Sequence, residues 1–457
     1  MGMHRQIRAD IDRRRVLKLG AGAVGALASV AVLRAINQAQ EEDKPPAHQP
    51  LWTFLLKDEG DQGTDLAPAV YAHGTLYLAT QEGAGLYALD ATNGRKRWHT
   101  PLSDTYTGEM TVSSGTVSSG TVYLATHDGA VHALRTSDGE HRWTARPNGH
   151  MGMREIADLT APMRLGSLVL LSILPSTYDE DPDPPPSVLY ALDATYGHLV
   201  WEREATLLDV RDGLAYIRLP DEGIAALDPQ TQELRWSAPP SNPTSNRTVD
   251  AFGKDTLYGR NGDNGIGSEL VAYDPRTGAV RWTSPATRAS SAVVQGDTVY
   301  INAPGHGKNA EQRLHALNAV TGAVRWTAPA FSTKSYESPV IAADADSVYL
   351  TWSEDLDLDH HLTTVQAYDA RTGRPRWRAE RAESSYSAVT APGHHLIVGY
   401  LDDWYGYDTR SGRARWRVSS GEDGTASAPP LVTDGVVYCA NEEGVRAIRL
   451  SQRPEEL

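Results

Sequence analysis

A short string ending in tryptophan recurs along most of this chain, and it constrains the fold more than any other feature. One copy reads VAYDPRTGAVRW, from Val271 to Trp282. Aligned on the tryptophan, the copies share a residue position eight places earlier that is almost always Asp or Asn, and a position four places earlier that is almost always Gly. The tryptophans of the eight copies are Trp98, Trp143, Trp201, Trp236, Trp282, Trp326, Trp377 and Trp416.

Each residue type in the string has a physical role in a β-hairpin. The apolar alternation before the polar residue predicts a strand with one buried face. The Asp or Asn can accept backbone N–H bonds as an Asx-turn, and the Gly supplies the positive φ that closes a hairpin. The Trp then ends the return strand, where its ring can be buried between neighbouring units. Arg135 and Gln232 depart from the pattern, so we expect their hairpins to be looser.

A second pair of apolar runs lies between one Trp and the next, as in SSAVVQGDTVYINAP. Each unit therefore holds four short strands, and the Trp-to-Trp spacing ranges from 35 to 58 residues. Four strands in a repeat of about 40–50 residues are the signature of a β-propeller. The fold class that the sequence predicts is all-β, as a single propeller of four-stranded blades.

The two ends of the repeat region complement each other. Trp52, in QPLWTF, resembles a final strand without its first three, whereas Ser427 to Leu450 supplies three strands without a final Trp. Pairing them would close a ring and leave no sheet edge exposed. By this count the ring has nine units, eight complete and one shared between the chain ends.

Strings of the form A-[LY]-D-x-x-T-G-x-x-x-W resemble the quinoprotein propeller repeat, the tryptophan docking motif of pyrroloquinoline quinone (PQQ) dehydrogenases. The resemblance covers Leu51 to Leu450. Non-enzymatic relatives carry the same repeat, among them an outer-membrane assembly lipoprotein and the extracellular sensor portions of some bacterial serine/threonine kinases. The resemblance implies eight blades, in which case the short unit ending at Trp236 would be a degenerate one.

The resemblance to the dehydrogenases concerns the scaffold. Those enzymes typically place adjacent disulfide-bonded cysteines over the quinone, beside a calcium or lanthanide ion and a catalytic Asp. The sole cysteine here, Cys439, allows no such disulfide, and no CxxCH haem-attachment motif is present. Its apolar surroundings predict a small buried side chain. We therefore expect no catalytic residue and no cofactor, and interpret the chain as a non-catalytic scaffold or sensor for an unidentified protein or small-molecule ligand. The alternatives are a haem-free PQQ-dependent alcohol or sugar dehydrogenase using PQQ with calcium, and a subunit that binds a membrane complex or kinase.

The N-terminal segment has the pattern of an export signal or an N-terminal anchor. A basic region, residues 1–18, precedes an uncharged apolar region, residues 19–33, which is shorter than the roughly 20 residues that span a bilayer. Arg13 and Arg14 resemble the pair of a twin-arginine signal, although Asp12 departs from it and no clear cleavage site follows. Residues 34–50 form a polar linker, and residues 51–457 form the propeller. The sequence thus predicts an exported, extracellular or cell-surface protein, membrane-anchored by residues 19–33 if the segment is retained.

Charge limits the possible partners. Beyond Lys44 the chain has 35 basic and 53 acidic residues, a net charge of −18, which opposes binding to nucleic acid and electrostatic adsorption to membranes. Any membrane contact is expected only through the N-terminal segment, and we expect a monomer. A ligand would meet the mouth of the central channel, where acidic residues precede the first strands of five units. These channel-mouth candidates for attracting a cation or cationic peptide are Asp65, Glu109, Asp158, Asp250 and Glu337.

Three further stretches contain residue types that bind metals. YDEDPDPPPS (Tyr178–Ser187) and SEDLDLDHH (Ser353–His361) are acidic, but neither has the spacing of a calcium loop. HMGMRE (His150–Glu155) groups soft ligands without a further partner nearby. We interpret the first and third as surface loops and the second as the end of an extended hairpin. The pairs His360–His361 and His394–His395 are predicted to be surface-loop histidines.

Overall fold

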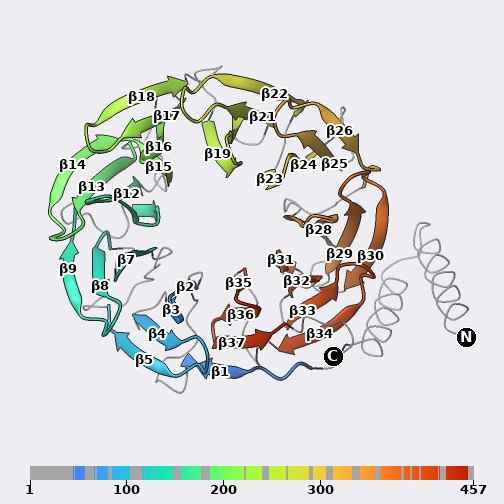
Figure 1. The fold of residues 1–457 in the computed structure, drawn as a ribbon, viewed down its shortest axis with the longest axis horizontal. Coiled ribbons are helices and arrows are strands. Elements are labelled where there is room, and N and C mark those ends of the chain that lie inside the picture. The colour runs from blue at the N-terminus through green and yellow to red at the C-terminus, as the bar shows by residue number, and fades with distance from the viewer. Residues whose placement is uncertain are drawn as a thin grey trace, which may run out of the picture.

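The computed structural model describes residues 45–450 except for the short segments 46, 57–65, 67–68, 81–84, 103–115, 119, 127, 148–155, 176–185, 221–222, 239–245, 264–265, 288–291, 305–311, 332–339, 356–360, 382–384, 392–393, 401–402, 420 and 422–428. Nine antiparallel sheets follow one another around a ring (Figure 1). This confirms the all-β propeller that the sequence predicts. Within the described part of the chain, no helix is long and apolar enough to cross a membrane.

The first three blades follow β1 in chain order, and the third has an extra short strand because β10 and β11 both pair with β12. Blade 1 contains β2 (Val70–Ala72), β3 (Thr75–Ala79), β4 (Leu86–Asp90) and β5 (Lys96–Thr100). Blade 2 contains β6 (Thr116–Ser118), β7 (Thr121–Ala125), β8 (Val131–Arg135) and β9 (His141–Ala145). Blade 3 contains β10 (Ile156–Leu159), β11 (Met163–Leu165), β12 (Leu168–Pro175), β13 (Val188–Asp193) and β14 (Leu199–Glu204).

The next three blades are regular four-stranded sheets. Blade 4 contains β15 (Thr206–Arg211), β16 (Leu214–Leu219), β17 (Gly223–Asp228) and β18 (Glu233–Ala238). Blade 5 contains β19 (Asn246–Phe252), β20 (Leu257–Asp263), β21 (Ile266–Tyr273) and β22 (Val280–Thr287). Blade 6 contains β23 (Ala292–Gln295), β24 (Thr298–Pro304), β25 (Gln312–Asn318) and β26 (Val324–Thr327).

The last three blades include the one shared by the chain ends. Blade 7 contains β27 (Val340–Ala343), β28 (Ser347–Asp355), β29 (His361–Asp369) and β30 (Pro375–Arg381). Blade 8 contains β31 (Ser385–Ala391), β32 (His395–Tyr400), β33 (Asp403–Asp408) and β34 (Ala414–Ser419). Blade 9 contains β35 (Leu431–Thr433), β36 (Val436–Asn441), β37 (Gly444–Arg449) and β1 (Trp52–Leu55).

Blade 9 closes the ring as the sequence predicts. Its sheet order is β35–β36–β37–β1, with Trp52 opposite Ala447. Just outside the strand, the Leu51 N–H donates to the Ala447 carbonyl at 2.8 Å. The structure has nine blades, so the eight implied by resemblance is wrong. The unit ending at Trp236 is not degenerate, because its four strands form the complete sheet of blade 4.

The hydrophobic core lies between consecutive blades rather than in one central cluster. One such cluster joins Tyr258 and Trp282 of blade 5 to Val299 and Leu317 of blade 6. Cys439 is fully buried between blades 8 and 9, as the sequence predicts, and burial raises the pKa of its thiol. Every blade therefore depends on both of its neighbours for burial of its apolar surface.

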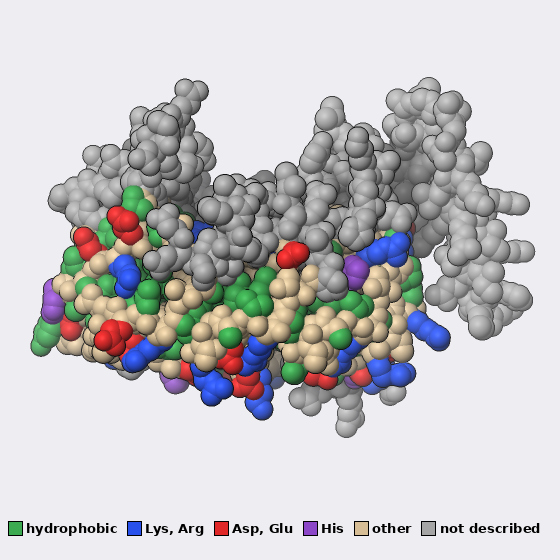
Figure 2. All heavy atoms as spheres, turned by 90° about the horizontal axis from the view of Figure 1, so that it is seen from above, with side chains coloured by type: hydrophobic (Ala, Val, Ile, Leu, Met, Phe, Trp, Pro, Cys, Tyr) green, Lys and Arg blue, Asp and Glu red, His purple; other side chains and the backbone are tan. Residues whose placement is uncertain are grey.

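Two sets of turns meet at the same face of the ring, which we call the turn face. Because all pairs are antiparallel, the turn from the first to the second strand and the turn from the third to the fourth strand lie at the same end of each sheet. A backbone bond joins the two turns in several blades, for example from Ala319 N to Asp297 O at 2.9 Å. Figure 2 shows acidic and basic side chains interspersed along the lower rim of the described surface.

Candidate functional site

The polar residues of the repeated string are used inside the hairpin that they form. In blade 5, Asp274 Oδ1 accepts from the backbone N–H groups of Arg276 at 2.9 Å and Thr277 at 3.2 Å. Gly278 N donates to Asp274 O at 2.8 Å, and Gly278 has a φ of 70°. The Arg281 guanidinium on the return strand bonds Asp274 Oδ2 at 2.7 Å and lowers the pKa of that carboxyl. Asp274 is therefore a turn cap, held from both strands.

The tryptophan rings of seven of these strings, and that of Trp52, lie over the hairpin of the following blade. Trp282 Nε1 donates to the Ala319 carbonyl at 3.1 Å, and a Cβ added to Gly322 would lie 2.6 Å from Trp282 Cδ2. The Gly thus serves the preceding blade as well as its own turn. The same Nε1-to-carbonyl bond, 2.8–3.1 Å long, joins Trp52 to Ala91, Trp98 to Thr136, Trp143 to Ala194, Trp201 to Pro229, Trp236 to Pro275, Trp282 to Ala319, Trp326 to Ala370 and Trp377 to Thr409.

A tyrosine on the second strand of most blades is a further part of this contact, and the sequence analysis missed it. Tyr258 lies opposite Ala272, which lies opposite Trp282, so the three form one row across blade 5. Tyr258 Oη donates to the same Ala319 carbonyl at 3.0 Å. Tyrosines of four other blades reach the equivalent carbonyl: Tyr123, Tyr216, Tyr300 and Tyr438. The signal in the sequence is a Tyr soon after the first turn of most blades, as in GTVY, DTLY and DTVY.

The two hairpins that depart from the string are closed as tightly as the others. Gln232 N donates to Asp228 O at 2.8 Å, and Gly139 N donates to Arg135 O at 2.9 Å. The expectation of looser hairpins is therefore wrong. Gln232 adopts a φ of 61°, so it takes the left-handed conformation that Gly takes elsewhere. Arg135 has an ion pair with Asp138 at 2.6 Å, which replaces the missing Asp as a polar contact within its turn.

None of the five acidic residues predicted at a channel mouth has its side chain among those that the structure describes. Asp65, Glu109 and Glu337 lie outside the described residues. Asp158 is in β10, and Asp250 is in β19, but only their backbone is described. An acidic mouth at these positions therefore stays a prediction.

The other sequence stretches with metal-binding residue types have mixed outcomes. Residues 150–155 and 176–185 lie outside the described chain, as do Arg13 and Arg14 of the export signal. Asp355 pairs with His361 at the end of the β28–β29 hairpin, which is extended as the sequence indicates. His394 is exposed in a turn, whereas His395 is buried in β32, so its prediction as a surface-loop residue is wrong. Among the side chains that are described, no three or more His, Cys, Asp or Glu are placed to hold a metal ion.

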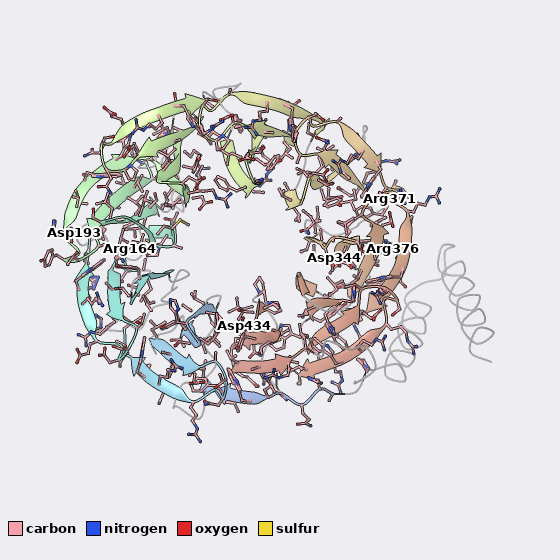
Figure 3. All side chains as sticks on the ribbon, in the orientation of Figure 1. Arg164, Asp193, Asp344, Arg371, Arg376 and Asp434 are labelled. Carbon is pink, nitrogen blue, oxygen red and sulfur yellow. The ribbon has the colours of Figure 1, made fainter. Side chains whose placement is uncertain are left out.

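Exposed aspartates occupy the turns between the first and second strands, the two inner strands, of several blades. We call this set the acidic turn ring, and it consists of Asp212, Asp255, Asp297, Asp346 and Asp434. In Figure 3, Asp434 of blade 9 and Asp344, in the same turn as Asp346 of blade 7, lie on the inner side of the ring, whereas Asp193 and Arg371 of third-to-fourth strand turns lie on its outer side. The sequence analysis did not single out these residues.

The acidic turn ring is only partly neutralised. Arg325 pairs with Asp297 at 2.6 Å and lowers the pKa of that carboxyl. Within the described residues, Asp212, Asp255 and Asp346 form no ion pair. Asp212, Asp255 and Asp346 therefore leave exposed carboxylates on the turn face that a cationic group can approach, with the exposed Arg211 and Lys254 beside two of them.

Comparisons with known proteins agree with this architecture. A family model described as "Outer membrane protein assembly factor BamB" matches residues 44–172, 186–301, 267–355 and 361–454. A curated protein of the same name from Moranella endobia (strain PCIT) is 25% identical over 177 residues, which are 38% of this chain and 44% of that protein. The chain thus aligns with less than half the length of this relative.

Two solved structures match the chain at low sequence identity. The crystal structure of BamB from Moraxella catarrhalis is 16% identical and matches with a TM-score of 0.49, covering 89% of this chain and all of that chain. The crystal structure of Sqt1 from Saccharomyces cerevisiae is 12% identical with a TM-score of 0.50, again covering 89% of this chain and all of that chain. At such identities the likeness concerns the fold alone.

Proposed function

The chain belongs to the PQQ-like repeat family described by the outer membrane protein assembly factor BamB, and we propose that it is an exported, non-catalytic propeller that binds a protein partner. Propellers suit this role because a closed ring presents many independent turns and loops on a rigid frame. Export is inferred from the N-terminal sequence, residues 1–33, with its basic and apolar regions.

One observation carries the proposal: the polar groups of the motif are already bound within the fold. Eight indole N–H groups donate to carbonyls of the next blade. The cap carboxylates accept turn N–H groups and bond return-strand arginines, as Asp274 does with Arg281. Groups engaged in this way serve stability, so a partner has to be recognised by residues that the repeat leaves exposed.

The acidic turn ring is the surface that we propose for this recognition. Its exposed carboxylates lie on turns of a rigid ring, so their positions are fixed before binding. A basic segment of a partner would be attracted to them, and the attraction would weaken as salt screens it. The partner class that fits is a protein with an exposed Lys- or Arg-rich segment.

Charge reversal tests this proposal. A triple variant, Asp212→Lys, Asp255→Lys and Asp346→Lys, should lose partner capture from native membranes, measured by crosslinking and mass spectrometry of the tagged full-length chain. The matched control reverses three exposed acids of outer strands, Glu202→Lys, Glu204→Lys and Glu233→Lys, and should capture the same partner as the wild type. Equal capture by both triple variants would exclude the acidic turn ring as the recognition surface.

Reconstitution with PQQ and calcium tests the alternative activity. If the proposal holds, quinone absorbance separates from the protein on gel filtration, and no dye is reduced with an alcohol or a sugar. Retained quinone together with dye reduction would make the chain a dehydrogenase and overturn the scaffold role.

Export is tested separately. The double variant Arg13→Lys, Arg14→Lys should stop export if the twin-arginine route is used, whereas fractionation of the wild type distinguishes a released protein from one anchored by residues 19–33. Wild-type protein found only in the cytoplasm would contradict the exported role.

A further inference from the structure

A buried arginine lies between blades 7 and 8 where other blades have apolar residues. Arg381 is the last residue of β30, four residues after Trp377, and is 6% exposed. The residues four positions after Trp52, Trp98 and Trp201 are also buried, and they are Leu56, Leu102 and Ala205. The fold therefore does not require a charge at this position.

Three tyrosines of blade 8 surround the guanidinium. Its carbon lies 3.5 Å from the centre of the Tyr405 ring and 5.7 Å from that of Tyr400. Its Nε donates to Tyr407 Oη at 3.2 Å, and the hydroxyls of Tyr400 and Tyr407 are 2.8 Å apart. The aromatic faces partly offset the cost of burying the charge, and the Tyr407 hydroxyl fixes the orientation of the guanidinium.

The guanidinium lacks an acidic partner. Arg381 Nη1 is buried without a hydrogen-bond partner, and Arg381 forms no ion pair with any described residue. The carboxylate of Asp403 is engaged nearby, where it accepts from Tyr405 Oη at 3.3 Å and from Arg417 Nη1 at 3.1 Å. A buried cation with an unused donor is costly unless an anion completes it.

We propose that Arg381, with Tyr400 and Tyr407 beside it, forms a binding site for one oxyanion, a carboxylate or a phosphate. A guanidinium presents paired donors whose geometry matches both groups, and water exclusion strengthens the bond. β30 ends at Arg381 and β32 ends at Tyr400, so the site lies at the sheet ends opposite the turn face. It is separate from the acidic turn ring and does not depend on the function proposed for that ring.

Thermal unfolding of the full-length chain tests this site. Titration with sodium phosphate or sodium acetate, each against sodium chloride at equal ionic strength, should raise the wild-type Tm to a plateau, because a ligand that binds only the folded state stabilises it. The anion that reaches its plateau at the lower concentration identifies the preferred class, and a peptide with a free C-terminal carboxylate compared with its amide distinguishes a peptide carboxylate from a free ion.

Substitutions test whether the anion raises the Tm by binding at Arg381. Arg381→Leu should abolish the saturable Tm rise while keeping the anion-free Tm at or above that of the wild type, since Leu occupies this position in blades 1 and 9. Arg374→Leu is the control, because it removes an exposed arginine directly before the other end of β30. Its Tm should rise with the anion as the wild-type Tm does. Should Arg381→Leu fail to fold, Tyr407→Phe should shift the half-saturation concentration upward by roughly tenfold, as expected for loss of about one hydrogen bond to the arginine. The proposal would be overturned if the wild-type Tm did not rise to a plateau with either anion. It would also be overturned if the Tm of Arg381→Leu, or of Tyr407→Phe where that variant is used in its place, rose as the wild-type Tm does.

Discussion

Eight of the nine blade-to-blade contacts use the same tryptophan geometry, and the contact between blades 8 and 9 differs. In the eight regular contacts the indole covers a hairpin of the next blade and donates to its backbone. At the ninth, Trp416 faces a blade whose β37 and β1 come from opposite ends of the chain, so no hairpin connects them. Trp416 is 2% exposed, whereas Trp282 is 8% exposed.

The residues around Trp416 account for the difference. The small residue opposite it is Gly406, where the regular blades have Ala, and a Cβ on Gly406 would lie 2.0 Å from Trp416 Cε2. The segment before β1 covers the ring from outside, with His48 N donating to Arg417 O at 2.8 Å. At this contact Gly406, from the tryptophan's own blade, and the segment before β1 therefore surround the ring, because the next blade presents no hairpin there.

Removing the indole of a regular contact should lower the free energy of unfolding most. Trp282→Ala deletes a buried aromatic side chain and its bond to Ala319, so it should lower the free energy of unfolding by about 3–5 kcal/mol. Urea denaturation followed by circular dichroism measures the change. A loss below about 1 kcal/mol would mean that the regular contact contributes little.

The glycine beneath a regular indole should be the next most sensitive position. Gly278→Ala places a Cβ 2.3 Å from Trp236 Cε3 at a φ of 70°, so overpacking and backbone strain together should cost about 2–4 kcal/mol. Gly435→Ala is the matched control, since its φ is 73° but no atom lies within 4 Å of the added Cβ. The control should cost about 1–2 kcal/mol, from backbone strain alone. Equal losses in the same denaturation experiment would remove the indole from the explanation.

The contact between blades 8 and 9 should be destabilised by the residue that the regular blades have at this position. Gly406→Ala restores the Ala of the other blades but collides with Trp416, so it should destabilise the ring by about 1–3 kcal/mol. The double variant Gly406→Ala, Trp416→Ala should then show non-additive losses, because the two side chains compete for one space. Additive losses would show that they do not interact.

The irregular hairpin of blade 4 should gain from conforming to the regular pattern. Gln232→Gly relieves a left-handed conformation in a residue with a Cβ, but it also adds freedom to the unfolded chain. We expect a net gain of about 0.5–1 kcal/mol in the free energy of unfolding. A net loss would show that the Gln232 side chain makes a favourable contact of its own.

Acidification should change the free energy of unfolding least, through the carboxylates of the regular hairpins. The pKa of Asp369 is lowered to about 2, first by its hydrogen bond with Arg376. A lowered carboxyl pKa gives stability that is present above the unfolded value of 3.8 and is lost as pH falls toward 2. Asp369→Asn should flatten the pH dependence in this window by less than about 1 kcal/mol, because the pair is exposed to solvent. An unchanged pH slope would contradict the assignment.

The ring and its closure could be predicted from the sequence because each motif residue has a local structural role that recurs from unit to unit. Asp, Gly and Trp fix a turn and an indole whatever the loops around them, and Trp52 supplied the missing strand. The number of blades implied by the resemblance is wrong because the unit ending at Trp236 forms a complete four-stranded sheet, in which Gln232 adopts the conformation of Gly. The tyrosine contact escaped notice because its distance from Trp varies, from Tyr77 and Trp98 to Tyr300 and Trp326.

The candidate binding surfaces were harder to predict. Asp212 and Asp346 are ordinary turn residues in sequence, and only the ring geometry places them on one face. Arg381 follows a motif Trp by four positions, as apolar residues do elsewhere, and its three tyrosines come from the next blade. Contacts between blades depend on registers that a single unit does not specify.

The measurement that tests the central claim most directly is partner capture by Trp282→Ala compared with the acidic turn ring variant, at a temperature where both remain folded. If the motif holds the ring together and exposed turns bind the partner, Trp282→Ala unfolds more readily in urea but captures the partner like the wild type, whereas the Asp212, Asp255 and Asp346 variant stays folded and loses capture. Loss of capture by Trp282→Ala at unchanged stability would contradict the account.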